Sequence, residues 1–201
     1  MKTAQLNEIF QKSISDYHIK DDVNQPVNNP YEEGSIEALM YQKAWVDTVQ
    51  WHLEDIIRDE EITPENALKI KRRIDKSNQH RTDLVEQIDD EIFEKYKSVN
   101  LKDDARLATE TAGWAIDRLS ILNLKIYHMK IEAEREGISQ ELKDKNTFKY
   151  NVLLQQREDL SAAIDTLLAD MAEGSVIAKT YKQMKMYNDP ELNPVLRKKS
   201  K

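Results

Sequence analysis

The chain has 201 residues, a formal net charge of -7, only 4 glycines and 5 prolines, and no cysteine. This length fits one large domain, and few helix breakers combined with 33% charged residues indicate long helices with solvated faces. The lack of cysteine excludes disulfides, thiolate zinc sites and cysteine nucleophiles, and it favours a reducing compartment such as the cytoplasm. The negative charge argues against general binding to nucleic acid or anionic membranes, and no stretch approaches the roughly 20 apolar residues of a membrane span.

Residues 1–34 are predicted to form a short amphipathic helix followed by a linker. Apolar residues from Leu6 to Tyr17 recur at helical spacing. Pro26 and Pro30 prevent this helix from continuing. The first ten residues lack a basic region followed by an apolar core, so we expect no signal peptide.

Residues 35–174 are predicted to form four long helices, over about 35–58, 63–97, 109–137 and 139–174. Serine or threonine stands at the start of each span, where its side chain can cap the free backbone amides. Pro64 suits the first position of the second helix, and Gly137 and Gly174 suit left-handed stops. The short connections within each pair of helices require antiparallel neighbours. The fold class is therefore predicted to be all-α, an up-down antiparallel four-helix bundle.

Residues 175–201 are predicted to add a short helix, to about residue 187, and an extended tail that Pro190 and Pro194 enforce. The tail ends in basic residues, which we interpret as a solvated terminus rather than a binding site. They are Arg197, Lys198, Lys199 and Lys201. We expect the whole chain, 1–201, to be a single helical domain.

Polar side chains interrupt the apolar stripes of these helices near their middles. Asn78 and Arg81 occupy the apolar sector of the second helix, and Arg157 occupies that of the fourth. With a rise of about 1.5 Å per residue, Asp47 and Gln50 should lie level with Asp75 and Asn78, and Asp117, Arg118 and Ser120 near Gln156 and Arg157. The connection between the two hairpins leaves open whether these clusters coincide. The candidate ligand-binding residues are Asp47, Gln50, Glu54, Asp75, Asn78, Arg81, Asp117, Arg118 and Arg157.

Two interpretations of this polar layer stay open. It is either a structural layer that fixes helix register, or a polar cavity for an anionic or sugar-like ligand. We favour a non-enzymatic binding or assembly protein. We expect a homodimer, because a second apolar face on the third helix exceeds what one core requires. The alternative is a small-molecule or magnesium-dependent enzyme that acts on a phosphorylated or sugar-like ligand at the layer.

The sequence motifs for metal and phosphate chemistry are missing. A di-iron bundle needs glutamate three residues before histidine, but Ser15, Val49, Ser77 and Lys125 hold those positions. No two histidines are four residues apart, and no glycine-rich phosphate loop exists. We therefore expect no metal ligands and no cofactor, and we assign no catalytic residue. Acidic residues that resemble the magnesium ligands of helical nucleotide pyrophosphohydrolases are Glu54, Asp55, Glu86, Asp89 and Asp90.

Six segments together resemble an uncharacterised bacterial family, the domain-of-unknown-function family 4254. They are residues 29–37 (NPYEEGSIE), 45–58 (WVDTVQWHLEDIIR), 71–78 (KRRIDKSN), 114–122 (WAIDRLSIL), 125–129 (KIYHM) and 181–189 (YKQMKMYND). The resemblance covers nearly the whole chain. It implies a bacterial cytoplasmic protein with a single helical domain and no established activity, and it carries over no catalytic residue.

Overall fold

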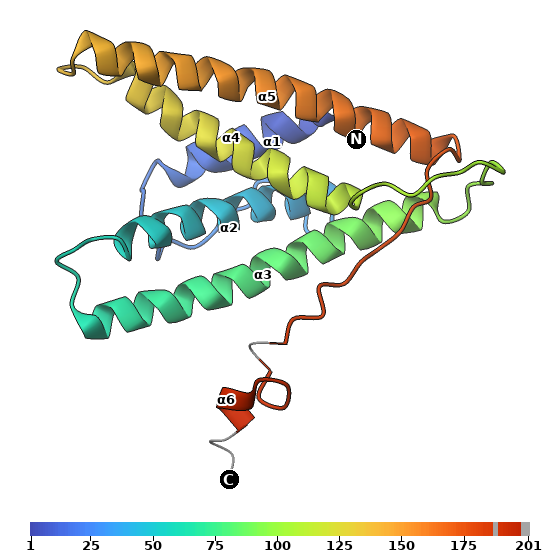
Figure 1. Cartoon of the computed structure of the whole chain (residues 1–201), viewed down its shortest axis with the longest axis horizontal. Helices are drawn as coiled ribbons and strands as arrows, with labels where there is room; N and C mark the ends of the chain where they lie inside the picture. The colour runs from blue at the N-terminus through green and yellow to red at the C-terminus, as the bar shows by residue number, and fades with distance from the viewer. Residues whose placement is uncertain (187–188, 198–201) are drawn as a thin grey trace.

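The computed structural model describes residues 1–186 and 189–197, which form six helices (Figure 1). The helices are α1 (Thr3–Tyr17), α2 (Ile36–Ile56), α3 (Pro64–Tyr96), α4 (Ala112–Glu134), α5 (Gln140–Ala172) and the short α6 (Pro194–Arg197). No strand of more than an isolated bridge forms in this part of the chain. The predicted all-helical bundle is therefore confirmed. None of these helices is both long and apolar enough to cross a membrane.

The long helices begin at the residues whose side chains were expected to cap them. Ser35, Thr63, Thr111 and Ser139 each accept a hydrogen bond from a backbone amide in the first turn of α2, α3, α4 and α5. Such caps satisfy amides that have no partner inside the helix. The predicted starts of the four long helices are thus accurate to within a few residues.

Helix α1 belongs to the core of the bundle rather than to its edge. It packs against α2, α4 and α5 (Figure 1). Phe10 and Tyr17 are fully buried, and Phe10 joins a core cluster with Tyr41 of α2 and Leu119 of α4. In contrast, α5 lies mainly on α4 and buries only Asn146, Ile164 and Met171. The N-terminal helix that was expected as an extension therefore supplies much of the apolar surface that closes the bundle.

The short helix expected over residues 175–187 is wrong for its described part, because residues 177–186 form no helix. The segment first pairs with the connection between α3 and α4, where the Ile177 amide donates to the Arg106 carbonyl at 3.0 Å. It then runs alongside α3. Lys182 binds Asp90 at 2.8 Å, and Lys185 Nζ lies 3.1 Å from the Asn78 carbonyl. The segment is therefore held by side-chain contacts with α3 and not by the backbone hydrogen bonds of the helix that was predicted for it. Lys198, Lys199 and Lys201 lie outside the described residues.

Candidate functional site

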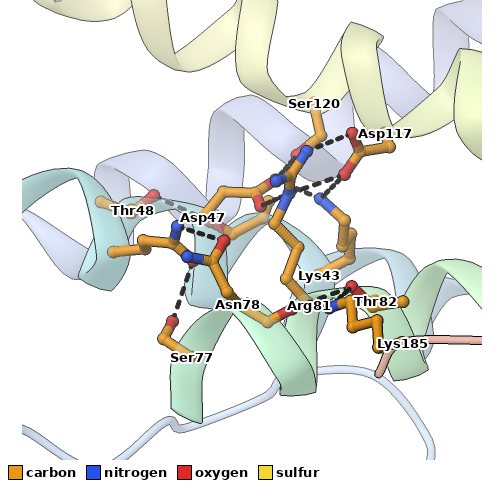
Figure 2. Close-up of polar contacts among 12 residues, drawn as sticks. Lys43, Asp47, Thr48, Ser77, Asn78, Arg81, Thr82, Asp117, Ser120 and Lys185 are labelled. Atoms are coloured by element: carbon orange, nitrogen blue, oxygen red, sulfur yellow. Dashed lines mark hydrogen bonds and ion pairs between the residues drawn. The ribbon is translucent and has the colours of Figure 1, made fainter. Parts of the chain in front are cut away.

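A buried cluster of four charged side chains joins the two helical hairpins at the middle of the bundle (Figure 2). Lys43 and Asp47 come from α2, one turn apart, while Arg81 comes from α3 and Asp117 from α4. Lys43 is 0% exposed, both aspartate side chains are 2% exposed, and Arg81 is 26% exposed. Charges this far from water are very costly unless they are paired. The cluster holds two cations and two anions and is therefore neutral overall.

Asp117 is the centre of the cluster. Its carboxylate receives Nε of Arg81 at 2.9 Å and Nη2 of the same guanidinium, a bidentate pair. Lys43 Nζ lies 2.8 Å from Asp117 Oδ1 and also donates to Asp47 Oδ2. Ser120, one turn beyond Asp117, donates to Asp47 Oδ2 at 2.6 Å. Bidentate and charge-assisted bonds of this kind are among the strongest hydrogen bonds in proteins.

The two aspartates of the cluster have different proton affinities. Burial raises the pKa of Asp47, an effect that Lys43 only partly offsets. Burial acts in the same direction on Asp117, but Lys43 and Arg81 outweigh it and hold the pKa of Asp117 below its usual value. Asp117 is therefore the carboxylate that stays ionised to lower pH, and Asp47 is the carboxyl group that protonates more readily.

Asp47 retains one acceptor atom without a donor. Its Oδ1 is buried and accepts no hydrogen bond from any described residue, and Arg81 Nε lies 3.5 Å away. Asp47 and Arg81 also border a cleft of about 320 Å³ between α2, α3 and α4. The cleft is lined by Asp47, Gln50, Trp51, Glu54, Asp55, Arg58, Arg81, Ile121 and Leu124. The buried carboxylate of Asp47 thus borders the cleft, and its lining combines one indole and two aliphatic side chains with polar and charged groups.

A neutral hydrogen-bond chain extends the cluster toward α3. Gln50 donates to Asn78 Oδ1 at 2.7 Å and accepts from Ser77 at 3.2 Å. Thr82 lies one turn beyond Asn78, and Lys185 of the C-terminal segment contacts both residues (Figure 2). The prediction that Gln50 and Asn78 lie at the same height along the bundle is therefore correct.

Three of the candidate residues lie away from this site. Asp75 pairs with Lys71 at the surface of α3, and Arg118 pairs with Glu110 and is 57% exposed. Arg157 of α5 reaches Asn123 at 3.5 Å, in a separate polar group with Gln11 of α1. The expectation that Asp117 and Ser120 lie near Arg157 is wrong. Both side chains turn toward α2, because their hydrogen-bond and ion-pair partners Asp47 and Lys43 lie there.

The acidic residues considered as magnesium ligands do not form one group. Glu54 and Asp55 line the cleft, with Glu54 paired to Arg58. Asp89 instead accepts hydrogen bonds from Thr111 and from the Gly113 amide, at 2.7 Å, so it caps the start of α4. Glu86 and Asp90 bind Lys182.

Sequence reasoning missed Lys43, the most deeply buried cation. Lysine is rarely buried, so its residue type gives no indication of a core position. Its position four residues after Leu39 and four before Asp47 places it on the apolar side of α2, and that spacing is the signal that would have found it. Reasoning from motifs also missed a cluster of three histidines, His18, His52 and His128, that come from three different elements.

The chain was compared with known proteins. A family model described as a protein of unknown function (DUF4254) matches residues 37–180, which include every charged residue of the buried cluster. No curated protein and no solved structure matches the chain. The matched region begins at the second residue of α2 and ends in the segment that comes after α5.

Proposed function

The chain belongs to the DUF4254 family of proteins of unknown function, and we propose that it is a non-enzymatic small-molecule-binding module. The ligand occupies the cleft beside Trp51, above the buried charged cluster. The observation that carries this proposal is Asp47 Oδ1, a buried acceptor at the cleft without a donor from any described residue. An unsatisfied buried carboxylate oxygen costs free energy that a ligand donor would recover.

The charges of the site favour a ligand that donates hydrogen bonds over an anion. Arg81 is paired with Asp117 and Arg58 with Glu54, so each guanidinium charge already has a carboxylate partner. Asp55 adds a further carboxylate to the rim. Hydroxyl or ammonium groups would bind Asp47, while Trp51 and Leu124 would contact the apolar face of a sugar or the methylenes of an amine.

The self-paired cluster supports a binding role rather than catalysis. A general acid or base must exchange a proton with its substrate, and a metal-dependent enzyme needs converging free carboxylates. Here all four charged groups are bonded within the cluster, and the acids considered for magnesium are divided between the cleft, the start of α4 and Lys182. The cytoplasmic location and the bacterial origin expected from the sequence stay predictions.

A thermal-shift and calorimetric screen tests the ligand proposal. Glucose, glucosamine and spermidine carry the donors that the site favours, and glucose 6-phosphate is the anionic comparison. We expect at least one donor-bearing compound to raise the melting temperature of the native protein. Asp47→Asn should weaken its binding tenfold or more, since a hydrogen bond to a charged group contributes about 1.5–3 kcal/mol.

Asp75→Asn is the matched control, because it removes a carboxylate from α3 outside the cleft. It should leave binding unchanged. If none of the four compounds raised the melting temperature, or if both variants weakened ligand binding equally, the proposed location of the site would be wrong. A response to glucose 6-phosphate alone would restore the anionic interpretation.

We further propose that a second copy of the chain covers the exposed apolar side of α5. Phe148 is 69% exposed and Val152 39% exposed. Both line a groove of about 490 Å³ that Trp51 and Leu153 also border. A projecting ring beside a groove on the same face is self-complementary under two-fold symmetry, because each Phe148 can enter the groove of its partner.

Light scattering at low micromolar concentration should give a dimer for the native chain and a monomer for Phe148→Glu. Leu68→Glu, at an exposed position of α3, should stay dimeric, and a native monomer would refute this proposal.

A further inference from the structure

Three of the four histidines of the chain lie together at one end of α1. His18 directly follows α1, His52 lies on α2 and His128 on α4. Their ligand nitrogens all lie within 4.8 Å of one another, and His52 Nε2 is 3.1 Å from His18 Nε2. In a tetrahedral zinc site with bonds of about 2.0–2.1 Å, two nitrogen ligands are about 3.3 Å apart. The His18–His52 pair thus already has the spacing of metal ligands, and His128 lies within 4.8 Å of both.

A backbone hydrogen bond fixes the tautomer of His18, whose Nε2 faces His52 Nε2 at 3.1 Å. His18 Nδ1 lies 2.7 Å from the Ile14 carbonyl, to which only an N–H can donate. The proton of a neutral His18 is therefore on Nδ1, and Nε2 carries a lone pair. Metal-binding histidines commonly use one nitrogen for such a backbone bond and the other for the metal. His128 Nε2 is buried and has no hydrogen-bond partner among the described residues.

Aromatic side chains hold each imidazole ring in place. Tyr17 stacks on His52 with an interplanar angle of 12°, and Trp51 stacks on His128 with an angle of 5°. Tyr127 packs on His18 with ring centroids 4.2 Å apart. Rings that are fixed before binding lose little freedom when an ion arrives, which favours affinity.

A carboxylate lies beside one of the three histidines. Asp21 Oδ1 lies 3.5 Å from His52 Nε2, and the Asp21 side chain is 55% exposed. Asp21 adopts a φ of +52°, a left-handed conformation that non-glycine residues seldom take. Its amide bonds to the Tyr17 carbonyl at 3.0 Å, so the turn after α1 brings the carboxylate back to the histidines from the solvent side.

We propose that His18, His52 and His128 bind a divalent transition-metal ion of the zinc class, with Asp21 at the fourth position. Three imidazole nitrogens and one oxygen in tetrahedral arrangement suit zinc, and cobalt is its spectroscopic substitute. The ion would satisfy the buried nitrogen of His128 and would tie α1, α2 and α4 together. Burial lowers the pKa of His128 to about 4 and that of His52 below its usual value, so both rings are neutral at pH 7, the form that metals bind.

The test uses the full chain, freed of any purification tag and stripped with EDTA, and titrates it with zinc chloride or cobalt chloride. We expect one zinc per chain by elemental analysis and a tetrahedral cobalt absorption spectrum in the visible range. His18→Gln, at the solvent-accessible end of α1, should weaken cobalt binding at least a hundredfold. Asp21→Asn should weaken it about tenfold, because the oxygen ligand can be replaced by water.

His80→Gln is the matched control, since His80 is exposed on α3 and does not belong to the cluster. It should bind cobalt as the native chain does, and circular dichroism should show all three variants folded. Absence of stoichiometric zinc and cobalt uptake by the folded native chain would overturn the proposal. So would a His18→Gln variant that binds as tightly as His80→Gln. The metal titration contains no sugar or amine, so its outcome is independent of the ligand proposed for the cleft.

Discussion

Asp117→Asn should lower the free energy of unfolding by about 3–5 kcal/mol, the usual cost of removing one partner from a buried ion pair. The substitution keeps the shape of the side chain but removes the charge that both Lys43 and Arg81 bind. Lys43 is fully buried and would keep only Asp47 as a counter-charge. Equilibrium unfolding in urea, followed by circular dichroism, measures the effect.

The neighbouring residue supplies the control for this prediction. Arg118→Gln removes an exposed pair with Glu110 and should change the unfolding free energy by less than about 1 kcal/mol. Equal losses in the two variants would show that the cluster contributes no more than a surface ion pair.

Acid unfolding gives a second measure of Asp117. Because its native pKa is lowered, its carboxylate stabilises the fold above the unfolded-state pKa of about 3.9 and loses this effect as the pH falls through the native value. The stability difference between the native chain and Asp117→Asn should therefore be constant above about pH 5 and should shrink below about pH 4. Asp47 acts in the opposite direction, since its raised pKa makes protonation relieve a buried charge.

Asp89→Ala should destabilise the protein by about 2–4 kcal/mol, because the aspartate caps α4 from a neighbouring helix. The change would leave the buried hydroxyl of Thr111 and the amide of Gly113 without their acceptor. Asp89→Asn should lose roughly half as much, since its amide oxygen still accepts one of the two bonds. Thermal and urea unfolding of the variants measure the series.

The adjacent Asp90 tests whether this effect is specific to the cap. Asp90→Ala removes only a half-exposed pair with Lys182 and should cost less than about 1 kcal/mol. A loss as large as that of Asp89→Ala would instead point to a general requirement for negative charge on this part of α3.

Local signals determined which parts of the fold were predictable. The capping residues Ser35, Thr63 and Ser139 act through bonds within one turn, so the helix starts could be read directly from the chain. The position of α1 depends on where an 18-residue connection leads it, and no local pattern determines that. The segment 177–186 was wrongly predicted to be helical, because apolar and basic spacing alone does not reveal side-chain contacts with α3.

The candidate site was predictable only in part, for a similar reason. Polar residues on apolar stripes indicated Asp47, Arg81 and Asp117, but the vertical register of α4 against α2 depends on the long connection after α3. Arg157 satisfied the same criterion and belongs to another polar group, beside Asn123. The histidine cluster has no motif, because its members are 34 and 76 residues apart along the chain and meet only when three elements pack.

Trp51 contacts both the histidine cluster and the cleft that Asp47 lines. One side of its ring lies flat on His128, and the same side chain borders the cleft above Asp47. A ligand that tilts the indole ring at one of these two sites would therefore change the shape of the other site. Binding at the histidine cluster would then change the affinity of the cleft, and binding at the cleft would change the affinity of the cluster by the same factor. The fluorescence of Trp51 would report both binding events.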